Sequence, residues 1–406
     1  MIQNKIKLSN FRNNLFALLA FTLPLNKNLI PLLIICTFIS WLAEGNFKAK
    51  WQRLKNPFFL LCISFYLIHL IGLFYTSNMK AGAFDMEQKL SFLLFPLLFF
   101  GTQIQDVIMC KITKSYLLGS FLAVFICLFN AVLKYYYSND IEVFFYTQFS
   151  VIMHSSYFAM YLCFAVALLL FKHEFIQNSA VKLGLILIFC CAILLLSSKS
   201  GIISLAFILS FYLLRNAFIH KKYLHLIVII SISIVATVGI YKQFPKIFER
   251  FTQMKSSLTQ HETELNTTTS RISIWKHSID IVKSNLFFGV GTGDVKDALK
   301  SEYNKQTEGQ LIEKQLNAHN QYLQTTIAFG LIGLIVLLAI FGTIFYLCIK
   351  VNIIDGALLI TIIAFNFLFE SMLETQAGVV FIAYFLMLYF SYSLNQLKTK
   401  NSNIAA

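Results

Sequence analysis

The stretch TTIAFGLIGLIVLLAIFGTIFYLCI, residues 325–349, decides the fold class. It contains no charged residue, and it is long enough to cross a bilayer as one helix, which needs about 20 apolar residues. The heptapeptide NAHNQYL, residues 317–323, lies at the end of the long polar segment that precedes this stretch. It places His319 beside Asn320. An ionisable imidazole therefore stands where water gives way to hydrocarbon. It is either an interfacial side chain or a catalytic base that faces a membrane-borne substrate.

The rest of the chain has the same apolar character. Its 406 residues are 57% hydrophobic and only 13% charged, with a mean hydropathy of +0.69, whereas a soluble domain is about 25% charged. We therefore expect an all-α polytopic membrane protein with about twelve transmembrane helices. The apolar runs that predict them lie near residues 13–26, 29–45, 57–75, 89–103, 115–134, 154–171, 183–198, 200–214, 223–241, 321–347, 356–373 and 377–394.

The distribution of basic residues predicts the topology. With the N-terminus inside, most lysines and arginines of the short connections fall on the cytoplasmic side, as the positive-inside rule requires. Both termini are then cytoplasmic and the long polar loop lies outside. This distribution accounts for the net charge of +14, so no nucleic-acid partner is expected. The predicted domains are a transmembrane bundle of about nine helices, the outer loop, the C-terminal transmembrane helices and a cytoplasmic tail: residues 1–241, 242–320, 321–395 and 396–406.

Two lysines stand out because they lie at the predicted outer face. Lys199, in SSKSG, interrupts two apolar runs, and a lysine deep in a membrane helix costs about 2.5–3.5 kcal/mol. Lys89, in EQKLSFLLFP, is a second case of the same kind. Each is either a lysine whose ammonium reaches the interface or a cation presented to an anionic lipid headgroup.

The second half of the outer loop carries a predicted helix and a glycine-rich turn. Ser270 is expected to cap a helix of residues 271–284, which places Arg271 in its first turn. Helical spacing of apolar residues predicts one apolar face on it, formed by Ile272, Trp275, Ile279 and Val282. The GVGTG stretch, residues 289–293, lacks the preceding strand and the following Gly-Lys-Ser/Thr of a nucleotide loop. We interpret it as a structural turn.

In combination, these elements resemble the O-antigen ligase and O-antigen polymerase superfamily of bacterial membrane glycosyltransferases. The resemblance rests on Arg271 and Trp275, then FGVGTG (288–293), AHNQYL (318–323) and FGLIGL (329–334), in this order. The SSKSG turn also resembles a family element, with Lys199 where the pattern has an arginine. The resemblance implies a bacterial inner-membrane protein with a fold similar to GT-C-like lipid-linked glycan transferases. One large loop would lie in the periplasm.

The resemblance also implies a reaction. A glycan would pass from undecaprenyl diphosphate to an acceptor at the periplasmic face, which for a ligase is a lipid A-core hydroxyl. A histidine exchanges a proton near neutral pH, which suits His319 as the base. The diphosphate is already a good leaving group, so no nucleotide or other cofactor is expected. No paired carboxylates or histidine cluster argues for a metal, so metal independence is expected. The predicted site residues are then Arg271 for catalysis and diphosphate binding, Lys199 and Lys89 for diphosphate binding, Asn320 for positioning the imidazole or the sugar, and His154, at the predicted outer face, for substrate positioning.

Several alternatives share some of these features. An O-antigen polymerase or a protein O-oligosaccharyltransferase would use the same donor with another glycan or protein acceptor. A transporter or lipid flippase would be expected to show internal repeats and charges near the membrane midplane, and the sequence shows no convincing repeat. Glu370 and Glu374, near the outer end of the run 356–373, are possible sugar contacts in the enzymatic interpretations.

Overall fold

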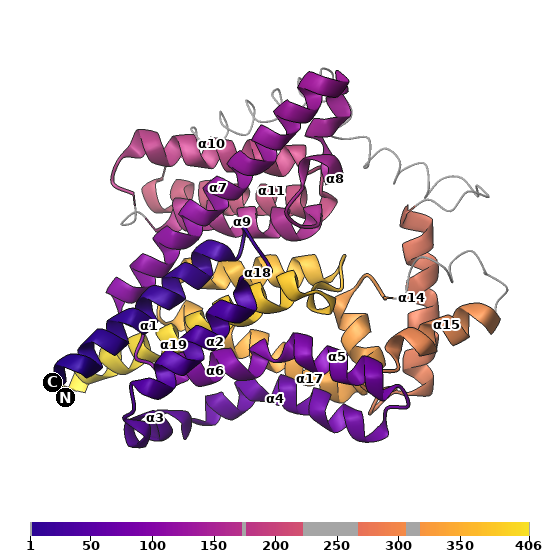
Figure 1. Cartoon of the computed structure of the whole chain (residues 1–406), viewed down its shortest axis with the longest axis horizontal. Coiled ribbons are helices and arrows are strands. Elements are labelled where there is room, and N and C mark those ends of the chain that lie inside the picture. The colour runs from indigo at the N-terminus through magenta and orange to yellow at the C-terminus, as the bar shows by residue number, and fades with distance from the viewer. Residues whose placement is uncertain (1, 173–175, 222–266, 306–316, 406) are drawn as a thin grey trace. The chain divides into compact units, whose positions relative to one another are not determined.

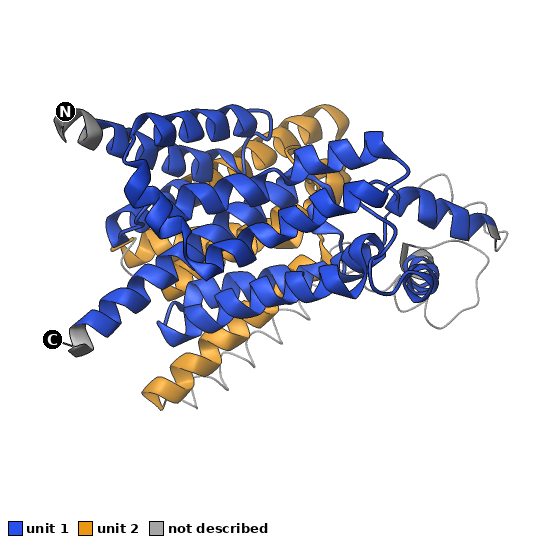
Figure 2. Ribbon diagram, turned by 90° about the horizontal axis from the view of Figure 1, so that it is seen from below, with its two compact units in different colours: residues 1–116, 270–406 blue, residues 117–269 orange. Residues whose placement is uncertain are grey.

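The computed structural model of the chain describes residues 2–172, 176–221, 267–305 and 317–405. Every regular element in these residues is helical. The chain divides into two compact units, shown in blue and orange in Figure 2: Met1–Tyr116 with Ser270–Ala406, and Leu117–Thr269. The first unit therefore joins the N-terminal part of the chain to the C-terminal part, including the described half of the predicted outer loop.

The helices of both units are labelled in Figure 1. Those of the first unit are α1 (Ile2–Thr22), α2 (Ile30–Ala43), α3 (Phe47–Leu54), α4 (Pro57–Gly72), η1 (Leu73–Tyr75), α5 (Met79–Lys89), α6 (Ser91–Phe100), α14 (Thr267–Ser284), α15 (Val295–Lys305), α17 (Gln321–Lys350), α18 (Ile354–Phe367), η4 (Met372–Glu374) and α19 (Gln376–Ala405). Helix α7 (Asp106–Ser138) begins in this unit and continues into the second. The second unit also holds η2 (Ile141–Phe144), α8 (Tyr146–Phe149), α9 (Ser155–Phe171), α10 (Ser179–Leu195) and α11 (Lys199–His220).

Asparagine side chains cap the N-termini of α4, α5 and α17. Asn56 and Asn78 each accept a hydrogen bond from a backbone N–H in the first turn of α4 and of α5. Asn320 does the same for α17. Such caps satisfy N–H groups that have no partner within the helix, and Pro57 reinforces the start of α4 because it has no N–H to satisfy. These caps fix where α4, α5 and α17 begin.

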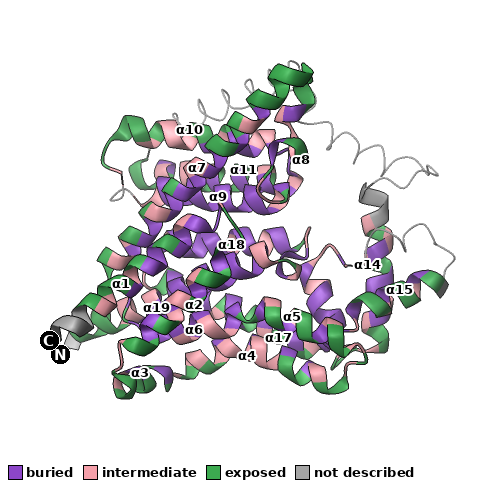
Figure 3. Ribbon diagram, viewed as in Figure 1, coloured by how far each residue is buried: buried purple, intermediate pink, exposed green. Residues whose placement is uncertain are grey.

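Helix α19 forms the centre of the first unit. Residues 379–390 are all buried (Figure 3), and α19 packs against α6 and α17. A helix that is apolar on every side belongs inside a bundle rather than at its surface. Helix α17 also packs against α4 and α18, so the residues at its start are held by a packed helical core.

Five described helical segments are long and apolar enough to cross a membrane: Pro57–Tyr75, Asp106–Ser138, Lys199–His220, Gln321–Lys350 and Gln376–Ser402. A sixth is possible if Ile30–Ala43 and Phe47–Leu54, which are bent by 115°, form one broken span. Shorter apolar helices are Ser155–Phe171, Ser179–Leu195 and Ile354–Phe367. The structure thus agrees with an all-α membrane protein. The number of about twelve spans, the periplasmic loop and the predicted domain boundaries stay predictions.

Two predicted runs need separate comment. The run 223–241 lies outside the described residues. The run 89–103 forms α6, which has 10 residues and is about 15 Å long. That length is roughly half of the hydrocarbon core of a bilayer, so α6 alone does not span it.

Candidate active site

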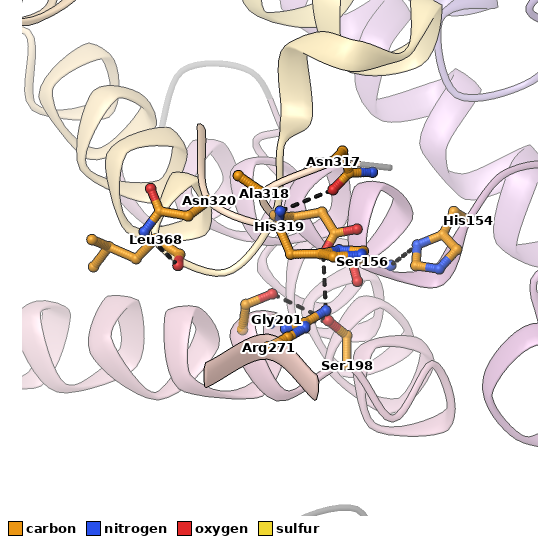
Figure 4. Close-up of polar contacts among 12 residues, drawn as sticks. His154, Ser156, Ser198, Gly201, Arg271, Asn317, Ala318, His319, Asn320 and Leu368 are labelled. Carbon is orange, nitrogen blue, oxygen red and sulfur yellow. Dashed lines mark hydrogen bonds and ion pairs between the residues drawn. The ribbon is translucent and has the colours of Figure 1, made fainter. Parts of the chain in front are cut away.

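His319 has an unusual backbone conformation at the start of α17. Its φ of +44° lies in the left-handed region, which few residues other than glycine adopt. Its N–H donates to Oδ1 of Asn317 at 2.9 Å (Figure 4). The preceding Ala318 is held on both sides, because its carbonyl accepts from Nε1 of Trp275 and its N–H donates to Oε1 of Gln324, at 2.9 and 3.0 Å. Strained backbone held by its neighbours is typical of functional sites.

Asn320 holds the other side of His319. Its Oδ1 caps α17 through the N–H of Leu323 at 3.1 Å, and its Nδ2 donates to the carbonyl of Leu368 at 3.2 Å (Figure 4). The next residue, Gln321, accepts the N–H of Leu373 at 2.7 Å. The start of α17 is therefore tied to the segment that follows α18. Asn320 thus helps to fix the backbone beside His319, and its predicted role in positioning substrate stays a prediction.

Arg271 and His319 meet at the carboxylate of Glu370, which lies between α18 and η4. The guanidinium of Arg271, on α14, is 3.0 Å from Oε2 of Glu370. Nδ1 of His319 is 3.5 Å from the same oxygen, at the long limit of a hydrogen bond. The three side chains are 34%, 19% and 13% exposed for Arg271, His319 and Glu370. We call them the open cluster. It joins a cation, an imidazole and a carboxylate in a place that solvent still reaches.

The glycine-rich stretch 289–293 packs its backbone against α17. The N–H groups of Val290 and Gly291 donate to the carbonyls of Ile327 and Ala328, both at 2.9 Å. In an unbroken helix these carbonyls would bond to N–H groups four residues further along the same helix. The stretch is a structural turn whose backbone binds α17 a few residues after His319.

Gly330 is the point where α17 departs from helical geometry. Its φ is 61° and its ψ is −158°, and a Cβ placed there would lie 2.2 Å from the backbone carbon of Phe287. The N–H of Leu331 turns to the carbonyl of Leu286 at 2.8 Å. Only glycine fits such a conformation so close to another backbone. The first turns of α17, with His319 before them, thus form a short segment clamped by the preceding loop.

Residues 183–338 match a family model described as O-antigen ligase. The resemblance to the O-antigen ligase superfamily is confirmed. No curated protein matches the chain. The matched stretch contains Lys199, Arg271 and His319, whereas Glu370 and Lys89 lie outside it. This match supports a membrane glycosyltransferase of the ligase and polymerase type, and the particular reaction is taken up below.

The structure places Lys89 in a different setting from the open cluster. Its ammonium forms ion pairs with Asp85 and, at 3.5 Å, with Glu374, and its side chain is 2% exposed. Nε2 of His69 lies 3.6 Å from the Asp85 carboxylate. We call Lys89, Asp85, Glu374 and His69 the buried cluster. A lysine already flanked by two carboxylates is poorly placed to receive a diphosphate from solvent.

Lys199 and His154 belong to the second unit and are described within it. Lys199 is the first residue of α11, only a few residues after α10 ends at Leu195, as the short SSKSG turn predicts. Its side chain is half-buried, and Ser198 caps the helix. His154 is exposed and caps α9, with Nδ1 accepting the N–H of Ser156 at 3.4 Å (Figure 4). The roles predicted for both residues stay predictions.

Helix α14 differs from its prediction in two ways. It already includes Thr267, so Ser270 lies inside the helix rather than at its cap, and Arg271 is not in the first turn. The predicted apolar face is also wrong in part, because Ile272 and Ile279 are 50% and 44% exposed. The buried isoleucines are Ile274 and Ile281.

Glu370 is a residue of the candidate site whose contacts with Arg271 and His319 were not predicted from the sequence. It was considered as a sugar contact, and the structure shows it between Arg271 and His319. The available signal was an acidic residue at the end of an apolar run, which is costly in a membrane and therefore points to a partner or a function.

One group of described side chains has atoms suited to a metal ion. His277 and Asp280 on α14 and Glu302 on α15 offer ligand atoms that all lie within 4.8 Å of one another. Asp280 also forms an ion pair with Lys283 at 3.0 Å. The group takes its side chains from α14 and α15, with His277 six residues after Arg271 on α14, and the reaction proposed below does not use it.

Proposed function

We propose that this protein is an O-antigen ligase, which transfers a polysaccharide from undecaprenyl diphosphate to a hydroxyl of lipid A-core at the periplasmic face of the bacterial inner membrane. The observation that carries the proposal is the open cluster. Arg271 and His319 are the two residues implied by the family resemblance for cation and base, and they share the Glu370 carboxylate. A reaction of this type needs positive charge at the leaving diphosphate and a base at the acceptor.

The proposed chemistry is a direct displacement. His319 takes the proton from the acceptor hydroxyl, whose oxygen then attacks the anomeric carbon of the donor sugar. A new glycosidic bond forms as the bond from that carbon to the diphosphate oxygen breaks, and the diphosphate leaves with the electron pair. Attack from the opposite side inverts the anomeric centre. The proposed reaction uses no metal or cofactor, because the diphosphate is already an activated leaving group.

Arg271 is suited to the leaving group because a guanidinium has five N–H donors in one plane. It can keep its contact with Glu370 while other donors meet phosphate oxygens. Lys199 is the second cation of the proposal, on the ground of its charge at the start of α11. Nδ1 of His319 faces Glu370, so Nε2 is the ring nitrogen proposed to accept the proton.

The first experiment is the lipopolysaccharide profile of a deletion strain complemented with wild type, Arg271→Ala, His319→Asn or Lys276→Ala. Asparagine tolerates the left-handed conformation of residue 319 better than alanine does, so this variant removes the base with little strain. Loss of a general base lowers the rate about 10²- to 10⁴-fold. Lys276 is exposed on the same helix as Arg271, and Lys276→Ala is the matched control.

The outcomes separate the alternatives. A ligase predicts core-only lipopolysaccharide and accumulated carrier-linked glycan in the deletion strain, restored by wild type and Lys276→Ala only. Core that carries a single repeat unit would instead identify a polymerase. An unchanged profile would contradict both and favour a protein acceptor or a transporter. Transfer by the purified enzyme in EDTA should match transfer without it, which tests the metal-independent step.

A further inference from the structure

A cavity of about 90 Å³, lined by both polar and apolar side chains, lies in the first unit beside the buried cluster. By the measure on which one water occupies about 10–15 Å³, it has room for roughly six waters. Phe84 and Lys296 of its lining are exposed, so the cavity opens to the surface and can take the edge of a larger ring. Three phenylalanines contribute to its wall, Phe65, Phe84 and Phe329. Its polar lining includes Asp85, Gln88, Lys89, Gln324, Thr325 and Glu374.

The charges of this lining favour a hydroxyl-rich ligand over a phosphate. Lys89 is neutralised by Asp85 and Glu374, with which it forms ion pairs. An entering phosphate would meet the two carboxylates, and Lys296, the other cation of the lining, is exposed. Carboxylate oxygens have about four lone-pair sites each. Asp85 and Glu374 can therefore accept hydrogen bonds from hydroxyl groups while they keep their contact with Lys89.

Gln324 supplies a donor in the same cavity. It is 3% exposed, and its Oε1 accepts the N–H of Ala318 at 3.0 Å. This bond fixes which end of the amide is oxygen, so Nε2 is the end left to donate. Among the described residues no hydrogen bond from Nε2 is formed. A buried amide donor costs free energy unless it finds an acceptor, and a ligand hydroxyl or a water in the cavity provides one.

The cavity adjoins the open cluster through two short segments of chain. Gln324 lies five residues after His319, and its Oε1 accepts the N–H of Ala318, the residue just before His319. Glu374 lies four residues after Glu370, and the N–H of Leu373 donates to Gln321 at 2.7 Å. A ring held in the cavity would thus lie near the residues proposed to act on a glycan.

We propose that this cavity is a subsite for one hexose ring of a glycan substrate. The proposal rests on the proposed function and adds a binding site to it. Carboxylates, an amide and a hydroxyl bind the ring's hydroxyl groups, and the phenylalanines cover its apolar face. The ring belongs either to the acceptor or to the donor, and the experiment distinguishes these sources.

The test fills the cavity without changing its charged groups. Ala81 is in its lining, on α5, so Ala81→Phe should occupy the space of the ring. Ala83 is on the same helix but exposed, and Ala83→Phe is the matched control. Purified full-length enzymes are compared with carrier-linked polysaccharide and lipid A-core as substrates, each varied while the other is saturating. Unfolding temperatures confirm that both variants fold.

We expect Ala81→Phe to raise one KM at least tenfold while Ala83→Phe leaves both unchanged. A higher KM for lipid A-core assigns the ring to the acceptor, and a higher KM for the carrier-linked polysaccharide assigns it to the donor. Unchanged KM values in a folded Ala81→Phe enzyme, or a fall in kcat alone, would overturn the proposal.

A binding experiment separates this proposal from the proposed function. If the wild-type enzyme transfers no glycan to lipid A-core, the ligase assignment fails, but the subsite can still be tested. Saturation-transfer NMR of the solubilised chain with methyl glucoside, methyl galactoside and methyl N-acetylglucosaminide should show binding that Ala81→Phe removes and Ala83→Phe retains. Absence of binding to all three probes in the wild type would then overturn the subsite.

Discussion

The open and buried clusters use similar groups in opposite surroundings. In the open cluster, Arg271 contacts Glu370 at 3.0 Å with 34% of its side chain exposed. In the buried cluster, Lys89 contacts Glu374 at 3.5 Å and also Asp85, with 2% of its side chain exposed. The two glutamates are four residues apart between α18 and α19. One short segment therefore supplies a carboxylate to each cluster.

The difference in exposure decides what each cation can do. Solvent reaches Arg271, and its five donors allow it to bind a phosphate without leaving Glu370. Lys89 has two carboxylates and almost no contact with solvent, so replacing either partner by a ligand would leave a buried charge uncompensated. Both residues were expected from the sequence to bind the diphosphate. The proposal keeps this role for Arg271 and Lys199, and gives Lys89 the role of holding two carboxylates beside the cavity.

The largest expected effect comes from Lys89→Met. Removing the cation leaves Asp85 and Glu374 facing each other with 16% and 22% of their side chains exposed. Breaking a fully buried pair costs about 3–5 kcal/mol, which is an upper bound here. We expect a large fall in the unfolding temperature of the solubilised protein and in its abundance in the membrane. Arg271→Met should cost about 1 kcal/mol or less, because exposed ion pairs contribute little.

The matched control for Lys89→Met removes the stranded charges as well. A triple variant with Asp85→Asn and Glu374→Gln should recover most of the lost stability, since no buried charge is then left alone. A Lys89→Met enzyme of wild-type stability with a raised KM for the carrier-linked donor would contradict this view. It would place Lys89 at the diphosphate and remove the distinction between the clusters.

A smaller effect is expected from Glu370→Gln in the open cluster. The glutamine keeps the size of the side chain but loses the charge that holds Arg271 and His319. Hydrogen bonds to charged groups contribute about 1.5–3 kcal/mol, which corresponds to a fall in kcat of roughly tenfold to a hundredfold. Initial rates of glycan transfer by the purified variant, across pH 5–9, measure both the fall and any change in the pH profile.

Glu374→Gln is the corresponding variant in the buried cluster, and its effects can be compared with those of Glu370→Gln. It should lower stability more than Glu370→Gln does, and it should leave the shape of the pH profile unchanged because Glu374 contacts Lys89 rather than His319. Equal effects of the two glutamine variants on kcat and on stability would show that the clusters act as one unit. A Glu370→Gln enzyme with wild-type kcat would remove Glu370 from the site.

The features that the sequence predicted correctly are those set by neighbours along the chain. The apolar runs predicted α4, α17 and α19, and the polar residues before α17 predicted that His319 lies at its start. The glycines predicted a turn at residues 289–293. Each of these depends on local composition or on a cap, which a few consecutive residues determine.

The features that were missed depend on contacts between distant segments. Glu370 is 51 residues from His319 and 99 from Arg271, and only the packing of α14, α17 and α18 brings them together. The apolar face of α14 was ambiguous for a physical reason. Ile272 and Ile279 have the same spacing as Ile274 and Ile281, so periodicity alone could not decide which pair is buried.

The smallest expected effect concerns Asp294, which binds the backbone at the start of α5, the helix that carries Asp85 and Lys89. Its carboxylate accepts the N–H groups of Ser77 and Asn78, both at 2.7 Å, and α5 begins at the next residue. Partial burial would raise the pKa of Asp294, but these backbone hydrogen bonds outweigh it and hold the pKa below its ordinary value. The group's stabilisation is therefore complete above the ordinary aspartate pKa of about 3.9 and is lost as the pH falls through the lower folded-state value.

Asp294→Asn should reduce stability by about 1 kcal/mol or less at neutral pH, because the contacts are partly exposed. The gap in unfolding temperature between wild type and variant should stay constant from pH 7 to about pH 5, and close below about pH 3.9. Asp297→Asn is the matched control, since Asp297 accepts a hydrogen bond from the side chain of Asn78 and, among the described residues, from no backbone N–H. A gap that widens on acidification would contradict the sign of the pKa shift. If Asp294→Asn lowered kcat without changing stability, Asp294 would influence the open cluster, and the geometry of the structure predicts no such effect.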